Sequence, residues 1–322
     1  VRVSVLHAAP SAGAVDIFVT GPGEEIGDVN PIDAAFNDAA GPLPLMPDTQ
    51  YRVRITPDGS STVVYDSGNV SFPAGTELLL VAVDNTFKVG TNPVNLLAVG
   101  ADGATEVLDA AMGAEVRVVH NSADTPAVDV LVDGAEVLNA VPFPAASAYA
   151  DIMAPAGTYN VVVAADADNS IAPIDENLTL DASSSYTAYA IGSFADGSIT
   201  ALVTEEDRRS IATAAVVQVI HGSYLVAAEI PVDIYLTTDG VIADADPAIA
   251  NLAYGEATAQ VQVTPGAYWI TVTAAGDKSV VAFDTGGTLA LDGGVNYTVV
   301  ARDPAAIEVA GLPLIRATIL TD

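Results

Sequence analysis

The 322-residue chain contains no cysteine, which excludes disulfide bridges and excludes zinc or redox sites built on thiolates. Cations are also scarce, because 10 basic residues stand against 41 acidic ones and give a net charge of -31 at pH 7. This balance argues against nucleic-acid binding, which needs a basic surface, and against adsorption to anionic lipid. A general adaptation to salty surroundings explains the charge better than a specific cation-binding role does.

Long apolar runs and helical periodicity are missing as well. The most apolar run is LLLVAV at residues 78–83, which fits a buried strand and is far shorter than the roughly 18 residues of a membrane span. A strand pattern starts at Val1 without an initiator Met and without a leader sequence. We therefore expect a mature extracellular or cell-surface chain from which an export signal has been removed.

One segment, VRVVHNSADTPAVDVLVDG at residues 116–134, occurs in three versions. It reads as two strands joined by a turn, with a histidine closing the first strand and an aspartate inside the second. The other versions begin at Val3 and Val217. The repeated anchors are the histidines His7, His120 and His221 and the aspartates Asp16, Asp129 and Asp233.

Three further anchors follow in the same order in each version. An aromatic residue opens a later strand, then comes an acidic turn, then a β-rich strand near the end of the unit. The aromatic anchors are Tyr51, Tyr159 and Tyr268. This order predicts three repeats, at residues 1–106, 113–206 and 214–322, each with a core of its own at roughly 100 residues.

Each repeat holds seven or eight short β-rich runs, separated by Gly, Pro, Asp and Asn. Period-2 alternation in VDVLVD and QVQVT indicates strands with one buried face. The pattern predicts an all-β protein of three tandem immunoglobulin-like antiparallel β-sandwich domains. The linkers are short and are not Gly/Ser-rich, and each could form a helical turn at the domain junction, so we expect a semi-rigid rod.

The strands VRVVHNSADTPAVDVLVDG, AGTYNVVV and SYTAYAIG resemble the DUF4397 family, a domain of unknown function in exported bacterial and archaeal proteins. The resemblance covers three tandem copies and is strongest in the second. The first copy departs most, since a long insertion at residues 21–47 replaces a short crossing and Leu78 stands near the position of Tyr186 and Tyr297. The resemblance implies an exported β-sandwich with a cell-surface role, and it brings no catalytic residues.

Ser122, His120 and Asp129 supply the residue types of a nucleophile, a base and an orienting acid. The first repeat, however, has Ala9 where the others have Ser122 and Ser223, and no oxyanion-hole motif accompanies them. We therefore interpret the histidine as a structural residue that closes the first strand and bonds loop backbone. A hydrolase at this cluster is the least favoured of three functional hypotheses.

Short acidic loops raise the question of calcium. Asp166, Asp168 and Asn169 form one such loop, and Asp244 and Asp246 form another. Neither has the spaced set of six to eight oxygen ligands that calcium takes, so solvated acidic turns are the better interpretation. We predict no cofactor and no metal site, and we read the three Asn-x-Ser/Thr triplets as chance matches.

The leading hypothesis is a non-enzymatic extracellular structural protein, the subunit of a surface filament, stalk or layer. Its partner would be further copies of the chain, joined into a homopolymer by inter-domain and head-to-tail contacts. The alternative is an adhesion or carbohydrate-binding module that uses the least repeat-like loops, at residues 21–47 and 239–254.

Overall fold

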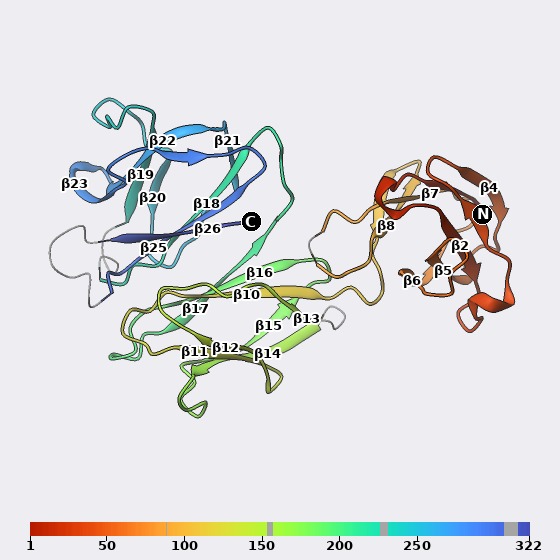
Figure 1. The fold of residues 1–322 in the computed structure, drawn as a ribbon, viewed down its shortest axis with the longest axis horizontal. Coiled ribbons are helices and arrows are strands. Elements are labelled where there is room, and N and C mark those ends of the chain that lie inside the picture. The colour runs from red at the N-terminus through yellow and green to blue at the C-terminus, as the bar shows by residue number, and fades with distance from the viewer. Residues whose placement is uncertain (88, 153–156, 226–230, 306–314) are drawn as a thin grey trace. The chain divides into compact units, whose positions relative to one another are not determined.

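The computed structural model describes residues 1–87, 89–152, 157–225, 231–305 and 315–322. The chain forms two compact units. The first comprises Val1–Ala114 and the short segment Asp181–Ser183, and it contains the first repeat. The second contains the second and third repeats (Figure 1). The described residues of these units form six main sheets, two for each repeat.

The first repeat is a sandwich of the sheets β4-β1-β7-β8-β9 and β3-β2-β5-β6. Its core is aliphatic apart from Tyr65 and Phe72, which lie on or just after β6. The strands are β1 Arg2–His7, β2 Val15–Thr20, β3 Ile32–Ala34, β4 Ala39–Pro44, β5 Gln50–Pro57, β6 Tyr65–Ser71, β7 Glu77–Asp84, β8 Val94–Gly100 and β9 Gly103–Val107.

The second repeat pairs its strands in the same way, in the sheets β13-β10-β16-β17 and β12-β11-β14-β15. Strands β10 and β16 are buried along their whole length, on both faces. The strands are β10 Ala114–His120, β11 Val128–Val132, β12 Ala135–Val141, β13 Ala150–Ile152, β14 Gly157–Ala165, β15 Ile174–Leu180, β16 Ser185–Ile191 and β17 Thr200–Glu206.

The third repeat follows the order of the second, with the sheets β21-β18-β25-β26 and β20-β19-β22-β23, the short strand β24 pairing with β22. Trp269, the only tryptophan of the chain, lies in β22. The strands are β18 Ala215–His221, β19 Val232–Thr237, β20 Ile249–Leu252, β21 Val261–Val263, β22 Gly266–Ala274, β23 Asp277–Asp284, β24 Leu289–Leu291, β25 Asn296–Arg302 and β26 Arg316–Thr321.

This architecture confirms the prediction of an all-β chain of tandem sandwiches. It differs from the predicted antiparallel sandwiches in one feature. One sheet of every repeat is mixed, with one parallel pair of strands. The first strand pairs in parallel with the penultimate main strand, as β1 with β7, β10 with β16 and β18 with β25. Parallel pairing places the histidine at the end of the first strand beside the end of its partner strand.

The long segment at residues 21–47 is less of an insertion than the sequence indicated. It contains β3 and β4, which are the edge strands of the two sheets and the counterparts of β12 and β13 in the second repeat. The repeats differ in the connection that precedes the first of these edge strands, which is β3, β12 or β20. In the second repeat this is the turn at Asp133 and Gly134, whereas the first and third repeats carry loops at residues 21–31 and 238–248.

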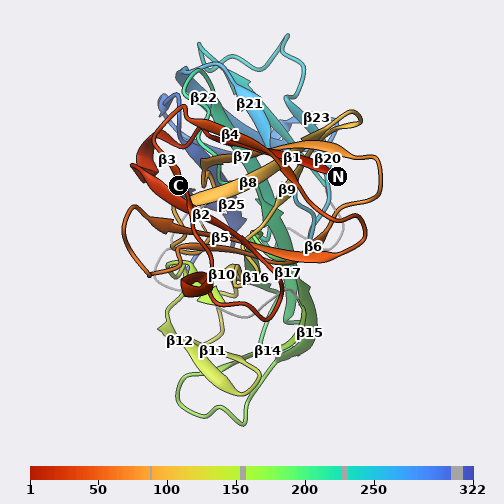
Figure 2. The same cartoon turned by 90° about the vertical axis from the view of Figure 1, so that its right-hand side faces the viewer.

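The second and third repeats do not follow each other end to end as the rod prediction requires. The sheet containing β10, β16 and β17 packs face to face against the sheet containing β18, β25 and β26, so this unit has four layers of strands (Figures 1 and 2). The linker at residues 207–214 is irregular and contains no helical turn. A rod would have contacts between the ends of successive domains, whereas these two repeats are in contact through the faces of their sheets.

Candidate functional site

The three repeated histidines are fully buried and have equivalent surroundings. Nε2 of His7 donates to the carbonyl of Gly13 at 2.5 Å, and Nε2 of His120 donates to the carbonyl of Pro126 at 2.7 Å. For His221, no hydrogen-bond partner of either ring nitrogen lies among the described residues. Burial lowers the pKa of His221 to about 4 and also lowers the pKa of His120.

An aromatic ring meets each histidine edge-on, and the sequence interpretation missed it. The rings are Phe36, Phe143 and Tyr254, with ring centroids 6.4, 5.8 and 6.1 Å from the histidine rings. In every repeat the histidine backbone N–H donates at 3.0 Å to the carbonyl two residues after the aromatic. The sequence does contain a signal for this ring. An aromatic residue precedes the edge strand of the mixed sheet in each repeat, although the rest of that connecting segment varies.

The repeated aspartates bind backbone and not histidine. Asp16 accepts from the N–H of Gly59 at 2.9 Å, and Asp129 accepts from the N–H of Ala140 at 2.8 Å. Asp233 accepts from the N–H of both Asn251 and Gly276, each at 2.8 Å. These carboxylates join the second strand of each repeat to turns or edge strands of the same sheet. Among the described residues, no hydrogen bond joins a repeated aspartate to its histidine.

The serines near the histidines bind a different set of carboxylates, which the sequence did not single out. Ser11 donates to Asp84 at 2.6 Å, and Ser223 donates to Asp303 at 2.7 Å. Both acids stand at the same position, at or just after the end of the strand that pairs in parallel with the first.

In the second repeat that position is Gly192, and Asp124 in the loop supplies the carboxylate instead. Asp124 accepts from Ser122 at 3.1 Å and from Ser193 at 2.7 Å. Although partial burial alone would raise its pKa, these donors together with backbone N–H groups hold the pKa at about 2. In all three repeats a serine–carboxylate contact therefore ties the loop after the histidine to the neighbouring strand.

The remaining predicted positions are distributed over strand starts and loops. Tyr51, Tyr159 and Tyr268 stand near the starts of β5, β14 and β22, and the hydroxyl of Tyr268 donates to the carbonyl of Thr264 at 2.8 Å. Asp168 is engaged locally by Ser170. Within the described ranges, no three acidic or histidine side chains gather closely enough to hold a metal ion. The same ranges hold no helix long and apolar enough to cross a bilayer.

The second and third repeats make both an apolar and a polar contact with each other. The apolar contact is a cluster in which residues from equivalent positions of the two repeats come together. The equivalent pairs are Val119 with Ile220, Tyr189 with Val300, and Ala146 with Ala257. Contact between equivalent positions is the pattern of an approximately two-fold, isologous interface. We call these two packed surfaces the mixed-sheet faces.

Beside the apolar cluster lies a buried ionic network centred on Arg117, which is 4% exposed. Its guanidinium donates to Glu206 at 2.9 Å, to Asp322 of the third repeat at 3.1 Å and to Thr187 at 3.1 Å. Tyr149 lies under the guanidinium, 4.5 Å from ring centroid to Cζ. The network is therefore a bridge between the two repeats as well as a contact within one sheet.

A second cation, Arg208 from the linker, completes the network. It pairs with Glu115, approaches Asp322 at 3.6 Å and also lies over the ring of Tyr149, with Cζ 3.8 Å from the ring centroid. Burial alone would lower the pKa of Arg117, but Glu206 and its neighbours outweigh burial and raise it. Burial and Glu206 raise the pKa of Tyr149. Arg117 thus stays charged beside the buried carboxylate of Glu206.

Gly222 is expected to be intolerant of a side chain, because it lies against Asn121 in the contact between the mixed-sheet faces. Asn121, at the equivalent position of the second repeat, donates to the carbonyl of Gly222 at 2.8 Å. A Cβ at Gly222 would stand 2.4 Å from the amide nitrogen of Asn121 and 3.2 Å from the carbonyl oxygen of Ala301. Gly222→Ala should cost about 1–3 kcal/mol of unfolding free energy.

Urea unfolding followed by Trp269 fluorescence would measure this loss. The double variant Asn121→Gly/Gly222→Ala removes the shorter contact and should recover part of the stability. Gly287→Ala is a suitable control, because a Cβ there meets nothing within 4 Å. If Gly222→Ala were as mild as the control, the close approach of the two repeats would be wrong.

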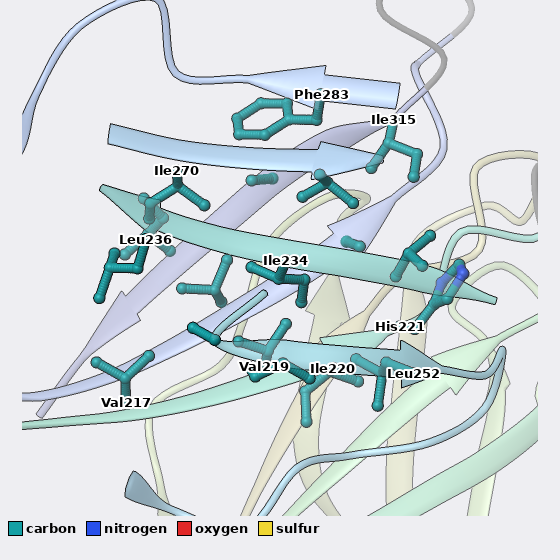
Figure 3. A pocket seen from close by; sticks show the side chains of 18 of the residues that line it. Val217, Val219, Ile220, His221, Ile234, Leu236, Leu252, Ile270, Phe283 and Ile315 are labelled. Carbon is teal, nitrogen blue, oxygen red and sulfur yellow. The ribbon is translucent and has the colours of Figure 1, made fainter. Parts of the chain in front are cut away.

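A cavity of about 260 Å³ lies between the two sheets of the third repeat (Figure 3). Aliphatic side chains from both sheets line it, together with the ring of Phe283, and His221 lies at one end. The labelled aliphatic residues are Val217, Val219, Ile220, Ile234, Leu236, Leu252, Ile270 and Ile315. Such a lining can take an apolar guest, since dry apolar cavities of this kind bind benzene or xenon.

Filling this cavity is expected to stabilise the third repeat. Val219 is 7% exposed and borders the cavity, so Val219→Ile adds one methylene to empty space. The gain should be about 0.8 kcal/mol, the value of one buried methylene. Urea unfolding followed by tryptophan fluorescence would show it, with Val281→Ile on the exposed side of β23 as control. A loss of stability in Val219→Ile would mean that the space is already filled.

Comparison with known proteins gives one family. The family described as "Domain of unknown function (DUF4397)" matches the chain twice, over residues 1–106 and 114–235. The rest of the third repeat lies outside these matches, although its strands pair in the order of the second repeat. No curated protein matches the chain.

Among solved structures, the Bacillus anthracis TIE protein aligns with 93% of this chain and 49% of its own, at 9% identity and a TM-score of 0.18. The chain thus spans about half the length of that protein. A similarity this low carries no argument about fold or function.

Proposed function

The chain belongs to the DUF4397 family, and we propose that it is a non-enzymatic extracellular structural protein, the subunit of a cell-surface filament, stalk or layer. The observation that carries the proposal is the union of the second and third repeats through their mixed-sheet faces. An apolar centre with polar contacts beside it is typical of stable interfaces between domains. The family resemblance, which implies an exported protein, supports the extracellular location.

The contacts of the repeated His, Asp and Ser residues support the non-enzymatic part of the proposal. His120 bonds to a loop carbonyl, Asp129 bonds to backbone N–H, and Ser122 bonds to Asp124 and Thr125. A catalytic triad needs these side chains to bond to one another in sequence. The geometry favours a structural role in which each residue fixes one loop of the sandwich.

Electron microscopy of the purified chain tests the proposal. High protein concentration and about 1 M salt should be used, because the Debye length then falls to ~3 Å and repulsion between copies of a chain of charge -31 is screened. Ordered filaments or sheets are the expected result. Particles that never exceed small oligomers under any such condition would contradict the assembly role.

A second candidate is adhesion or carbohydrate binding, using the segments at 21–47 and 239–254. The observation that favours it is the extra loop at 21–31 and at 238–248, at the same point of the fold in the first and third repeats. Loops on rigid sandwiches are common recognition sites. A glycan array with the intact chain, compared with a variant whose 238–248 loop is shortened to an Asp-Gly turn, would separate binding from background.

A further inference from the structure

The first repeat carries the same mixed-sheet face that is buried between the second and third repeats. In repeat one this face consists of the outward side chains of β1, β7 and β8, which run side by side (Figure 2). Its five central residues are Leu6, Leu79, Val81, Leu97 and Val99. All five are only partly buried, whereas their inward neighbours Val3, Val5, Leu80 and Leu96 are buried.

Strand register identifies the counterparts of these five residues in the other repeats. They are Val119, Thr187, Tyr189, Leu202 and Thr204 in the second repeat. In the third repeat they are Ile220, Thr298, Val300, Thr318 and Leu320. Each face that is buried in the chain thus has two threonines among the five positions, while the face of the first repeat is apolar at all five. Of the ten counterparts, Leu202, Thr318 and Leu320 are partly buried and the other seven are buried, so the most apolar of the three faces is also the least covered one.

Two positions with small residues in the first repeat also match positions in the contact between the second and third repeats. Ala39 pairs with Leu6, as Ala146 bridges to Val119 and Ala257 to Ile220, so the alanine of the apolar cluster recurs. Ala8 follows His7, as Asn121 and Gly222, which contact each other between the second and third repeats, follow their histidines. A small residue at Ala8 leaves room for a second sheet to come equally close.

We propose that the mixed-sheet face of the first repeat binds the same face of a second copy of the chain, in a two-fold dimer that copies the packing of the second repeat on the third. The choice of a second copy as the partner follows from the interface between the second and third repeats. In that interface, equivalent residues contact each other with approximate two-fold symmetry. Two identical faces can repeat that arrangement as an isologous contact. At the edge of the face Arg2 and Glu77 pair with each other at 3.5 Å, so this pair adds no net charge.

This dimer would be one of the contacts within the proposed assembly, and in that sense it rests on the proposed function. A two-fold contact closes on itself, so a filament needs at least one further contact. The two ideas therefore fail separately. A dimer without filaments contradicts the assembly role, and filaments that persist without this contact contradict the dimer.

Sedimentation velocity on the full chain over a wide concentration range tests the dimer. In about 1 M salt we expect a species with twice the 32.6 kDa mass of the chain. Val81→Lys should weaken the dimer at least about tenfold, because it places a charge at the centre of an apolar interface. Val63→Lys is the matched control, since Val63 is also in the first repeat and is 40% exposed outside the face.

Because lysine lowers the net negative charge, weaker association of Val81→Lys cannot come from added repulsion. If that variant unfolds, Leu79→Thr provides the milder change, as threonine stands at this position in both other repeats. A chain that stays monomeric in high salt, or a dimer that responds equally to Val81→Lys and Val63→Lys, would overturn the proposal.

A cysteine cross-link gives an independent readout, because the chain has no cysteine of its own. Ala8→Cys should form a disulfide-linked dimer on mild oxidation, since equivalent residues at this position face each other across the two-fold axis. Val63→Cys should not form one under the same conditions. Equal cross-linking of both variants would show random collision and count against the dimer.

Discussion

Replacing Arg117 by Met is expected to lower the unfolding free energy of the unit formed by the second and third repeats by about 3–5 kcal/mol. Arg117 is 4% exposed and faces Glu206, which is 2% exposed. Met has a similar length but no donors, so Glu206 would lose the cation it is paired with. Removing one partner of a buried ion pair costs far more than the pair contributes, because a buried charge is left unpaired.

The measurement is urea unfolding followed by fluorescence of Trp269, which lies in the third repeat and so reports on this unit. Arg209→Met is the control, because Arg209 pairs with Asp207 at the surface with 63% of its side chain exposed. Exposed pairs contribute only about 0–1 kcal/mol, so the control should be nearly neutral. Equal effects of the two substitutions would show that the network is not buried in solution.

The double variant Arg117→Met/Glu206→Gln separates lost charge pairing from lost packing. It should be more stable than Arg117→Met alone at neutral pH, because a neutral amide in place of the Glu206 carboxylate leaves no unpaired buried charge. A double variant that is no more stable than Arg117→Met would point to packing as the main cause.

The sequence predicted well what local patterns determine. Period-2 alternation and repeated turns identified the strands, and His7, His120 and His221 each end the first strand of a pair of sheets. Alternation depends only on which face of a strand is buried, so it can be read without knowing what covers that face. The all-β class follows from such local information.

The mixed sheets and the contact between repeats could not be read in the same way. The parallel pairing of β1 with β7 joins residues more than seventy positions apart, and nothing in either strand fixes its partner. Arg117 and Glu115 occupy positions that alternation assigns to solvent. They are buried in contacts with Tyr149, with Arg208 of the linker and with Asp322 of the third repeat. Continuous burial of β10 and β16 is a property of the assembled unit and not of the strand sequence.

The histidine environment was predicted in part. A structural role at the end of the strand was expected, but the aromatic ring beside it and the carboxylates that hold its loop were not. Phe36, Phe143 and Tyr254 differ in type and lie on crossings of different length, which hid their common position. The carboxylate that binds the loop comes from the strand end as Asp84 and Asp303 but from the loop as Asp124, so no fixed spacing marks it.

The chain should lose roughly 3 kcal/mol of stability through His221 alone as the pH falls from 6.5 to 4. Burial lowers the pKa of His221 from 6.5 to about 4. Between these values the unfolded chain binds a proton that the folded chain does not, so stability falls with falling pH. The stabilisation is fully present above pH 6.5 and is lost across this window, at about 1.4 kcal/mol for each pKa unit.

Comparison of the parent with His221→Phe isolates this contribution. Phenylalanine keeps a ring against Tyr254 but cannot take up a proton. Between pH 6.5 and 4 the slope of unfolding free energy against pH should therefore be smaller in the variant, by the contribution of about one proton. His120, whose pKa is also lowered, titrates in both proteins and cancels in the difference. Asp124, with a pKa of about 2, loses its stabilising effect only below the window.

Asp303, which binds the loop after His221, changes the stability with pH in the opposite direction to His221. Its contribution must therefore be the same in the two proteins that are compared. Burial raises its pKa although Ser223 and the N–H of Leu225 donate to it, so its contribution to stability grows as the pH falls. For that reason the difference between the two chains, and not the slope of either, is the quantity to measure. Parallel stability curves for parent and His221→Phe would mean that His221 is solvated or hydrogen-bonded in solution. If His221 is solvated, the cavity beside it contains water that an apolar guest would have to displace.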